Sequence, residues 1–371
     1  MKRTVLNMFL ALLILAHVLS MPAASAEGKG MVHQILMLDN AFLVLHEDGT
    51  VVPVILDPDA DFGYSEYYLF AHGAKEISGW TDITQLACCK SFVAGLRADG
   101  SVTAAQLDGK SSAVRRAVGE WENIASLSSG YRYIAALCKD GTIRMAGEEP
   151  YYGEETSYFD EMDSWTDLVR LKIGVCAAGE YAVGLRSDGT ILYHGIDDVG
   201  WSGPQDAIVD FDCSGWSLGA VREDGTVICN GEDSSMLRLP THTWKDMKQV
   251  VCGDTKMFGL RRDGIVVETA WNESLLSFYT EQTALTDVRR IELEMYNYFA
   301  AYRSDGSVVI QYSVLDGATL KQTASWKDVV QVYVSSYNDV GFALGLKSDG
   351  TVLSAGLDYD RLYRDAVQMY S

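Results

Sequence analysis

A pattern built on the dipeptide Asp-Gly recurs eight times along the chain, each time with the same kinds of neighbours. After each copy comes Thr, Ser or Ile and then Val or Ile, and Gly or Ala stands four positions before the Asp in seven copies. The aspartates are Asp48, Asp99, Asp140, Asp188, Asp224, Asp263, Asp305 and Asp349. Self-similarity at a roughly fixed interval is the signature of a repeat architecture, so the fold follows from the repeat.

The pattern around each Asp-Gly pair predicts a β-hairpin. Apolar residues precede the pair and β-branched residues follow it, as in Phe92–Leu96 and Thr351–Leu353, and both favour extended chain. Asp-Gly fits a type I′ turn, whose twist matches that of the flanking strands. The Gly or Ala four positions earlier indicates closely packed strands, and the basic residue two positions before most turns is expected to face solvent.

A second motif, Trp-x-Asp or Trp-x-Asn followed by an apolar residue, lies between the hairpins. It begins at Trp80, Trp121, Trp165, Trp244 and Trp326, and three further copies at 204, 285 and 363 lack the Trp. Successive copies are 37 to 44 residues apart. Short strands in a unit of this length, with no helical periodicity, predict an all-β fold and a single β-propeller.

The two ends of the chain bear on the number of blades. The last copy of the second motif, in residues 363–370, has no hairpin after it, and the first hairpin, 42–55, follows only the looser segment 32–38. We therefore predict that a C-terminal strand pairs into the first blade and closes a ring of eight blades. Seven blades, with one degenerate unit outside the ring, is the alternative.

Over residues 31–370 these repeats resemble the regulator of chromosome condensation (RCC1-like) repeat family. The closest stretches are Trp80 to Ala105, Trp165 to Gly195 and Trp326 to Gly356. The resemblance implies a β-propeller, usually of seven blades. The family includes secreted bacterial proteins, among them β-lactamase inhibitory proteins of the type II superfamily, as well as eukaryotic nucleotide-exchange factors and chromatin binders. The family's Gly-Gln-Leu-Gly stretch is absent here, and nothing matches an exchange-factor site.

The N-terminus has the features of a signal peptide over residues 1–26. Lys2 and Arg3 precede an apolar run, and Ala24-Ser25-Ala26 offers a cleavage site after Ala26. The apolar run is too short for a membrane anchor, and no later segment is long enough to span a bilayer. We expect residues 27–371 to form the propeller and to be secreted, and we expect a monomer.

Recognisable enzyme and metal motifs are missing. No nucleophile elbow, zinc-protease or phosphate-binding pattern occurs, so we predict no catalytic residue, cofactor or metal ligand. Asp57, Asp59 and Asp61 resemble the start of a calcium loop, but the twelfth position is Tyr68 rather than Glu. The seven cysteines lack paired metal spacings and are expected to be small buried hydrophobes. The net charge of −21 argues against nucleic acid as a partner.

Aromatic residues concentrate in the loops after the hairpins, often beside acidic residues. Such clusters are typical of protein-binding surfaces, and a basic partner surface would be electrostatically favoured. We interpret the protein as a non-catalytic binding module for an extracellular or cell-wall-associated protein. A propeller enzyme that acts on glycans through axial carboxylates is the alternative, and a β-lactamase inhibitor is a narrower one. The candidate contact residues are Tyr64, Tyr67, Tyr68, Tyr151, Tyr152, Tyr158, Phe159, Trp201, Trp271 and Tyr279.

Overall fold

The computed structural model describes most of the chain after the predicted signal peptide. Its described residues are 31–38, 41–56, 73–107, 113–147, 160–176, 179–195, 205–215, 217–229, 241–253, 256–272, 277–294, 298–337 and 340–370. The predicted signal peptide therefore lies outside this part. Residues 31–371 make up one structural unit.

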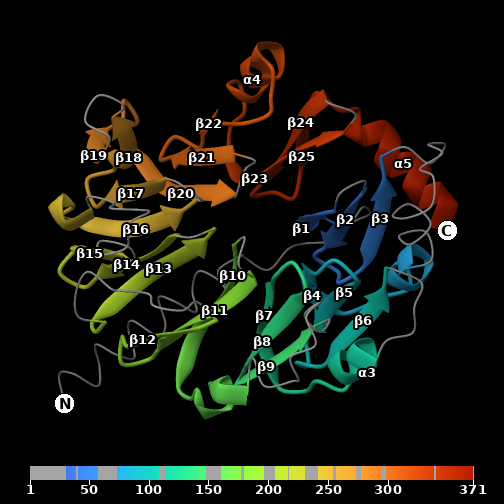
Figure 1. The fold of residues 1–371 in the computed structure, drawn as a ribbon. Coiled ribbons are helices and arrows are strands. Elements are labelled where there is room, and N and C mark those ends of the chain that lie inside the picture. The colour runs from blue at the N-terminus through green and yellow to red at the C-terminus, as the bar shows by residue number, and fades with distance from the viewer. Residues whose placement is uncertain are drawn as a thin grey trace. The chain divides into compact units, whose positions relative to one another are not determined.

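Within the described residues, twenty-five strands form eight antiparallel sheets, which we number as blades 1 to 8 in chain order (Figure 1). Seven blades have three strands and blade 6 has four. The strands are β1 Val32–Met37, β2 Ala41–His46, β3 Val51–Ile55; β4 Ile83–Cys88, β5 Phe92–Arg97, β6 Val102–Gln106; β7 Ile124–Ser129, β8 Tyr133–Cys138, β9 Ile143–Gly147; β10 Leu168–Cys176, β11 Gly179–Arg186, β12 Ile191–His194; β13 Ile208–Ser214, β14 Ser217–Arg222, β15 Val227–Cys229; β16 Met247–Cys252, β17 Met257–Arg261, β18 Val266–Asn272, β19 Ser277–Gln282; β20 Val288–Glu294, β21 Tyr298–Arg303, β22 Val308–Gln311; and β23 Val329–Tyr337, β24 Val340–Lys347, β25 Val352–Ala355.

Short helices pack on the outer strands. Helix α3 contacts β6, α4 contacts β22 and β25, α5 contacts β3, and the 3-10 helix η2 contacts β15. Their bounds are α3 Ala113–Gly119, α4 Gly317–Thr323, α5 Tyr359–Tyr370, η1 Asp160–Ser164 and η2 Thr241–Thr243. These helices cover strand edges that would otherwise present unpaired backbone groups. None of the helices in the described ranges has the length and apolar character needed to cross a membrane.

The Asp-Gly hairpins form as predicted, but their turn type differs from the prediction. In the first hairpin, the amide of Gly49 donates to the carbonyl of His46 at 3.0 Å and the amide of His46 donates to the carbonyl of Thr50 at 2.9 Å. Gly49 has a φ of +81°, whereas Asp48 does not have a positive φ. This is a three-residue loop with a glycine bulge rather than the type I′ turn.

The Asp side chain explains the difference in turn type. The carboxylate of Asp48 accepts hydrogen bonds from the amide of Thr50 at 2.9 Å and from its hydroxyl at 2.6 Å. These bonds lower the pKa of Asp48. The Asp therefore caps the strand that follows, and only the Gly needs the left-handed conformation. The basic residues two positions before most turns are half-buried rather than fully exposed, as Arg97 illustrates.

The Trp-x-Asp motif forms the junction between blades. Asp82 has a φ of 61°, and its carbonyl accepts from the amide of Ala98 in its own blade at 3.0 Å. The next residue, Ile83, donates its amide to the carbonyl of Gly49, in the hairpin turn of blade 1, at 3.1 Å. The same bond joins Ile124 to Gly100, Leu168 to Gly141, Ile208 to Gly189, Met247 to Gly225, Val288 to Gly264 and Val329 to Gly306.

The ring of eight blades closes through the N-terminal segment, not through a C-terminal strand. The amide of Val32 donates to the carbonyl of Gly350 in blade 8 at 3.2 Å, and Met31 accepts from Glu47 at 2.8 Å. Residues 31–38 are therefore the eighth copy of the junction. A further bond runs from the amide of Ile35 to the hydroxyl of Tyr333 at 3.0 Å. The prediction of eight blades is confirmed.

The predicted C-terminal strand is instead helix α5. Its buried residues Tyr359, Leu362 and Ala366 are spaced three and four apart, which places them on one helical face, against blade 1. Asp358 caps the helix by accepting from the amide of Arg361 at 3.1 Å. The stretch beginning at Tyr363 matched the junction motif only locally, and the helical spacing of its apolar residues decided its structure.

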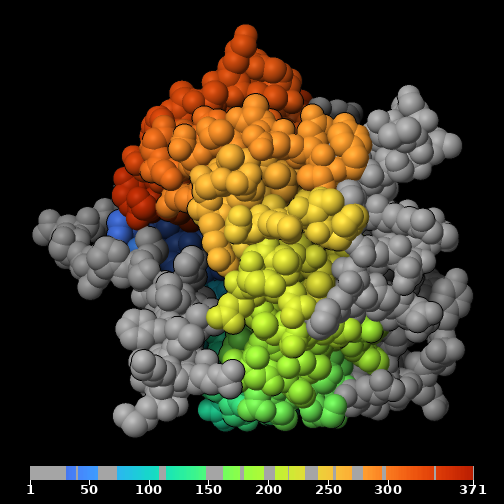
Figure 2. Space-filling model, turned by 90° about the vertical axis from the view of Figure 1, so that its left-hand side faces the viewer, coloured from blue at the N-terminus to red at the C-terminus, as the bar shows by residue number. Residues whose placement is uncertain are grey.

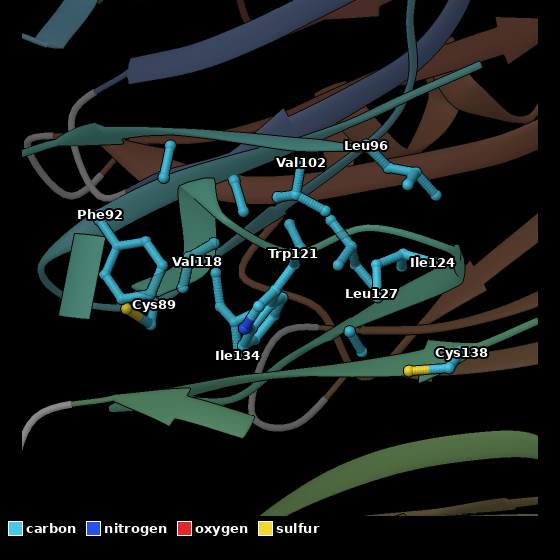
Figure 3. Packing of buried hydrophobic residues seen from close by; sticks show 14 residues of the cluster. Cys89, Phe92, Leu96, Val102, Val118, Trp121, Ile124, Leu127, Ile134 and Cys138 are labelled. Carbon is cyan, nitrogen blue, oxygen red and sulfur yellow. The ribbon is translucent and has the colours of Figure 1, made fainter. Parts of the chain in front are cut away.

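The cores lie between neighbouring blades, and the motif tryptophans belong to them (Figure 3). Trp121 packs with Leu96 and Val102 of blade 2 and with Ile124 and Ile134 of blade 3. The outer wall seen from the side shows successive blades lying next to one another in chain order (Figure 2). Packing each blade against two neighbours buries a face that no single three-stranded sheet could bury alone.

The Gly four positions before the Asp lies under the Trp ring. A Cβ on Gly95 would approach the Trp80 ring to 3.0 Å, and a Cβ on Gly259 would approach the Trp244 ring to 2.7 Å. Gly184 and Gly345 lie in the same way under Trp165 and Trp326. The predicted crowding is confirmed, and its cause is the ring. The position is Ala in the two blades whose junctions lack Trp, and also in blade 3, where Ala136 belongs to the same blade as Trp121. In blade 5 the junction begins at Gln205, one residue later than the sequence pattern indicated, and Ala207 takes the left-handed conformation that Asp82 has in blade 2.

The cysteines of the described residues are not joined in disulfides. Cys89, Cys138, Cys213, Cys229 and Cys252 are buried, and Cys88 is half-buried. They occupy core positions, as expected of small hydrophobes. The side chain of Cys176 lies outside the described part.

We predict that Gly259→Ala lowers the free energy of unfolding by about 1–3 kcal/mol, because the added methyl group overlaps the Trp244 ring. Urea denaturation measures the change. Gly119→Ala is the matched control, since a Cβ there meets nothing within 4 Å and Ala suits a helix. Equal stability of the two variants would contradict the packing argument.

Candidate functional site

The antiparallel order of the strands gives the ring two different faces. The turns between first and second strands, and the ends of the third strands, lie at one end of every sheet, which we call the loop face. The eight Asp-Gly turns lie at the opposite end, which we call the hairpin face. The two ends of the strands therefore present different chemistry.

Exposed large apolar side chains gather on the loop face. Tyr131 lies between β7 and β8, Tyr312 and Val314 follow β22, and Val340 begins β24. The other exposed ones in the described ranges are Tyr279 on β19 and Val367 and Met369 on α5, and the Asp-Gly turns carry none. Contiguous exposed apolar surface on a soluble protein commonly marks an interaction site.

Tyr312 is the centre of one such group. Its hydroxyl donates to the Glu268 carboxylate at 3.0 Å. The Lys256 ammonium lies 4.1 Å from the centroid of the Tyr312 ring and 3.6 Å from Glu268. Burial, followed by the charge of Glu268, raises the pKa of Tyr312 to about 12. Tyr312 has a φ of 51°, which is rare for a bulky residue, so the surrounding contacts hold its backbone in place.

A second Tyr–Glu pair lies beside the first. The Tyr279 hydroxyl donates to the Glu281 carboxylate at 3.1 Å, and this bond raises the pKa of Tyr279. The charge of Glu268 also acts on Tyr279, and the charge of Glu281 acts on Tyr312. The two pairs are therefore electrostatic neighbours, although β19 and the segment after β22 belong to different blades.

Val314 and Val340 continue the group towards blade 8. A Cβ on Gly341 would lie 2.4 Å from the carbonyl oxygen of Val314, so the two chain segments touch at this point. Val340 is 59% exposed and Tyr312 is 54% exposed. We call the whole surface the blade 6–8 patch, and it consists of Lys256, Glu268, Tyr279, Glu281, Tyr312, Val314 and Val340.

The structure describes only two of the residues predicted from the sequence to make contacts. Tyr279 lies in the patch and is 41% exposed, and the backbone of Trp271 lies in β18, paired with Phe278. The other predicted contact residues lie outside the described residues: Tyr64, Tyr67, Tyr68, Tyr151, Tyr152, Tyr158, Phe159 and Trp201. The segment of Asp57, Asp59 and Asp61, which resembled a calcium loop, lies outside them as well.

The sequence analysis did not find Val314, Val340, Lys256 or Glu268. Valine occurs throughout the buried strands, so its residue type alone does not separate an exposed position from a core one. Glu268 comes from a strand and Lys256 from a turn in the same blade, and only the fold brings them to the ring of Tyr312. Tyr312 could be recognised from the sequence, because it directly follows the third strand of its blade and so lies in a segment of the loop face.

The first strands of neighbouring blades contact one another around the axis of the ring, and we call them the innermost strands. Polar side chains join them. The Gln34 side chain donates to the carbonyl of Leu86 at 3.0 Å and accepts from the amide of Leu86 at 2.8 Å, which links blade 1 to blade 2. Gln85 and Gln249 make the same pair of bonds to Leu127 and Ile291. Each glutamine satisfies backbone groups of the next blade.

In blades 4, 5 and 7, charged residues take these positions or lie two residues further along the same strand. Arg170 forms an ion pair with Asp210 at 2.6 Å, and Lys172 forms one with Asp212. In blade 7, Glu292 accepts hydrogen bonds from the hydroxyls of Tyr298 and Tyr302, each at 2.8 Å. The carboxylates of Asp210 and Asp212 therefore join neighbouring blades, whereas the carboxylate of Glu292 binds residues of its own blade.

Glu294, at the end of β20, differs from the other axial acids. Its backbone pairs with Tyr298 in the sheet, but its carboxylate has no hydrogen bond or ion pair within the part of the chain that the structure describes. The Glu294 side chain is exposed to solvent at the end of β20. Its pKa is raised because the surrounding protein reduces its hydration, and Lys172 opposes this effect while Glu292 and Asp212 add to it. These influences come from residues of blades 4, 5 and 7, so charges of several blades act on this carboxylate. The ionised form of Glu294 is disfavoured there.

Comparison with known proteins finds structures that are similar at low sequence identity. No family model and no curated protein matches the sequence. The computationally designed Ika8 protein is similar at 15% identity and TM-score 0.49, covering 88% of this chain and 96% of its own. The Dos1 propeller has 10% identity and TM-score 0.45, covering 85% and 88%. Yeast RCC1 (Prp20), solved with Kap60, has 11% identity and TM-score 0.43, covering 92% and 84%.

We predict that Glu294→Gln slightly stabilises the protein at pH 7, since solvent screens part of the electrostatic cost at this exposed side chain. Because folding raises the pKa of Glu294 above its ordinary value of 4.5, the ionised carboxylate costs stability at neutral pH, and this cost disappears as the pH falls below about 4.5. Urea denaturation at pH 7 and pH 4 should show a benefit that shrinks in acid. The exposed Glu122→Gln is the control, and a Glu294→Gln benefit that stays constant or grows in acid would refute the prediction.

Proposed function

We propose that the protein is a secreted, non-catalytic binding propeller that contacts an extracellular or cell-wall-associated protein through its loop face. The observation that carries this proposal is the unequal distribution of exposed apolar side chains in the described ranges. Tyr131, Tyr312, Val314 and Val340 lie at the loop face, whereas the Asp-Gly turns of the hairpin face carry none.

The make-up of the blade 6–8 patch supports a protein as the partner. Tyrosine and aliphatic side chains form its centre, and Lys256, Glu268 and Glu281 lie beside them. Interfaces between proteins combine an aromatic and aliphatic centre with a polar rim, and tyrosine is frequent among the residues that dominate binding. The hydrogen bonds of Tyr279 and Tyr312 hold their rings in fixed positions before binding, which lowers the entropy cost of association.

The charge of the protein favours a partner with a basic surface. The chain has 51 acidic and 30 basic residues, so its long-range field attracts positively charged proteins and speeds their encounter. An acidic surface also disfavours nucleic acid, whose binding needs clustered Lys and Arg.

Secretion is supported by the N-terminal sequence. The basic start, the apolar run and the site at Ala24-Ser25-Ala26 form a complete export signal. Mass spectrometry of the protein from culture medium tests this part of the proposal. The expected mature N-terminus is Glu27, and retention of residues 1–26 on protein found inside the cell would contradict secretion.

The binding surface is tested by cross-linking the mature protein to its surroundings, purifying the partner, and measuring Kd. We predict that Val340→Asp combined with Tyr312→Ala weakens binding at least about tenfold, because the double change removes an aromatic anchor and buries a charge at the interface. Ala98→Asp puts the same charge on the hairpin face and should leave Kd unchanged. Equal Kd for the double variant and the unaltered protein would exclude the patch.

A further inference from the structure

The two Tyr–Glu pairs of the blade 6–8 patch consist of the same groups, but among the described residues only the first pair also holds a cation. In each pair a tyrosine hydroxyl donates to a glutamate carboxylate: Tyr312 to Glu268 at 3.0 Å and Tyr279 to Glu281 at 3.1 Å. A phenol that donates to a carboxylate presents an electron-rich ring beside a negative charge. This arrangement attracts a cation both to the ring face and to the carboxylate.

The first pair has its cation. The Lys256 ammonium lies 4.1 Å from the Tyr312 ring centroid and 3.6 Å from the Glu268 carboxylate. Glu268 is buried, and Lys256 compensates its charge. The protein itself therefore shows what a Tyr–Glu pair of this kind accepts, namely a cation that contacts both partners; Arg290 likewise lies 4.0 Å from the ring centroid of Tyr302 and 3.4 Å from Glu292.

The second pair has no such cation among the described residues. Tyr279 and Glu281 are both exposed, and no Lys or Arg of the described ranges forms an ion pair with Glu281. Glu268 and Glu281 outnumber Lys256, so the patch carries one negative charge in excess. The excess charge lies next to the exposed apolar side chains that a partner would cover.

We propose that the Tyr279–Glu281 pair binds a Lys or Arg side chain of the partner, and that aliphatic side chains next to this cation pack on Tyr312 and Val314. The proposal rests on the proposed function, since it specifies the chemistry of the protein that the loop face binds. The partner's cation lies against the Tyr279 ring and pairs with Glu281, as Lys256 does with Tyr312 and Glu268.

A pair of synthetic peptides tests the proposal without the natural partner. The first is an acetylated, amidated and fluorescein-labelled Ser-Val-Arg-Val-Ser, and the second has citrulline in place of Arg, which removes the charge and keeps the shape. We expect the arginine peptide to bind the mature protein about three- to tenfold more tightly in fluorescence anisotropy, with a preference that declines as salt is added.

Two substitutions locate the preference. Glu281→Gln should abolish the preference, so that the two peptides bind with about equal Kd. Glu122 is an exposed glutamate at a blade junction, and Glu122→Gln should leave the preference unchanged. Equal binding of the two peptides, no binding of either, or a preference that survives Glu281→Gln would overturn the proposal. Those results would leave the loop-face assignment untouched, because that assignment depends on the partner Kd of the Val340→Asp and Tyr312→Ala double variant.

Discussion

The structure depends on the hydrogen bond that joins the start of each blade to the hairpin turn of the blade before it. The donor is the first amide of an innermost strand, as in Ile83, and the acceptor is the carbonyl of the turn glycine, as in Gly49. Asp82 adopts a left-handed conformation so that this amide points at the turn. One such bond contributes little net stability, but eight of them around a ring set the position of every blade relative to its neighbours.

This junction also explains which parts of the fold could be predicted. Asp, Gly and Trp at fixed spacing are local requirements of the turn and the junction, so they recur visibly and reveal the eight units. The closing junction at Met31 and Val32 lacks both Trp and Asp, because there the Gly350 turn and the following strand make the contact with other residues. The stretch at Tyr363 carries the Asp but folds as helix α5, since Leu362 and Ala366 pack on one face.

The candidate site was less predictable than the fold. The sequence drew attention to long aromatic loops, and among their residues Tyr279 lies in the patch. The rest of the patch arises when blades 6, 7 and 8 bring Lys256, Tyr312 and Val340 together, and no local pattern encodes that meeting. A rigid ring suits such a surface, because contributions from several blades are held in place without any one of them folding around the partner.

Amide hydrogen exchange at the closing junction tests the central claim most directly. If the N-terminal segment completes an eight-blade ring, the amide of Val32, which donates to Gly350, should be protected to a similar degree as the amide of Ile83, which donates to Gly49. Exchange of the Val32 amide at the rate of an unstructured chain, with Ile83 still protected, would contradict the account, because blade 1 and blade 8 would then not be joined.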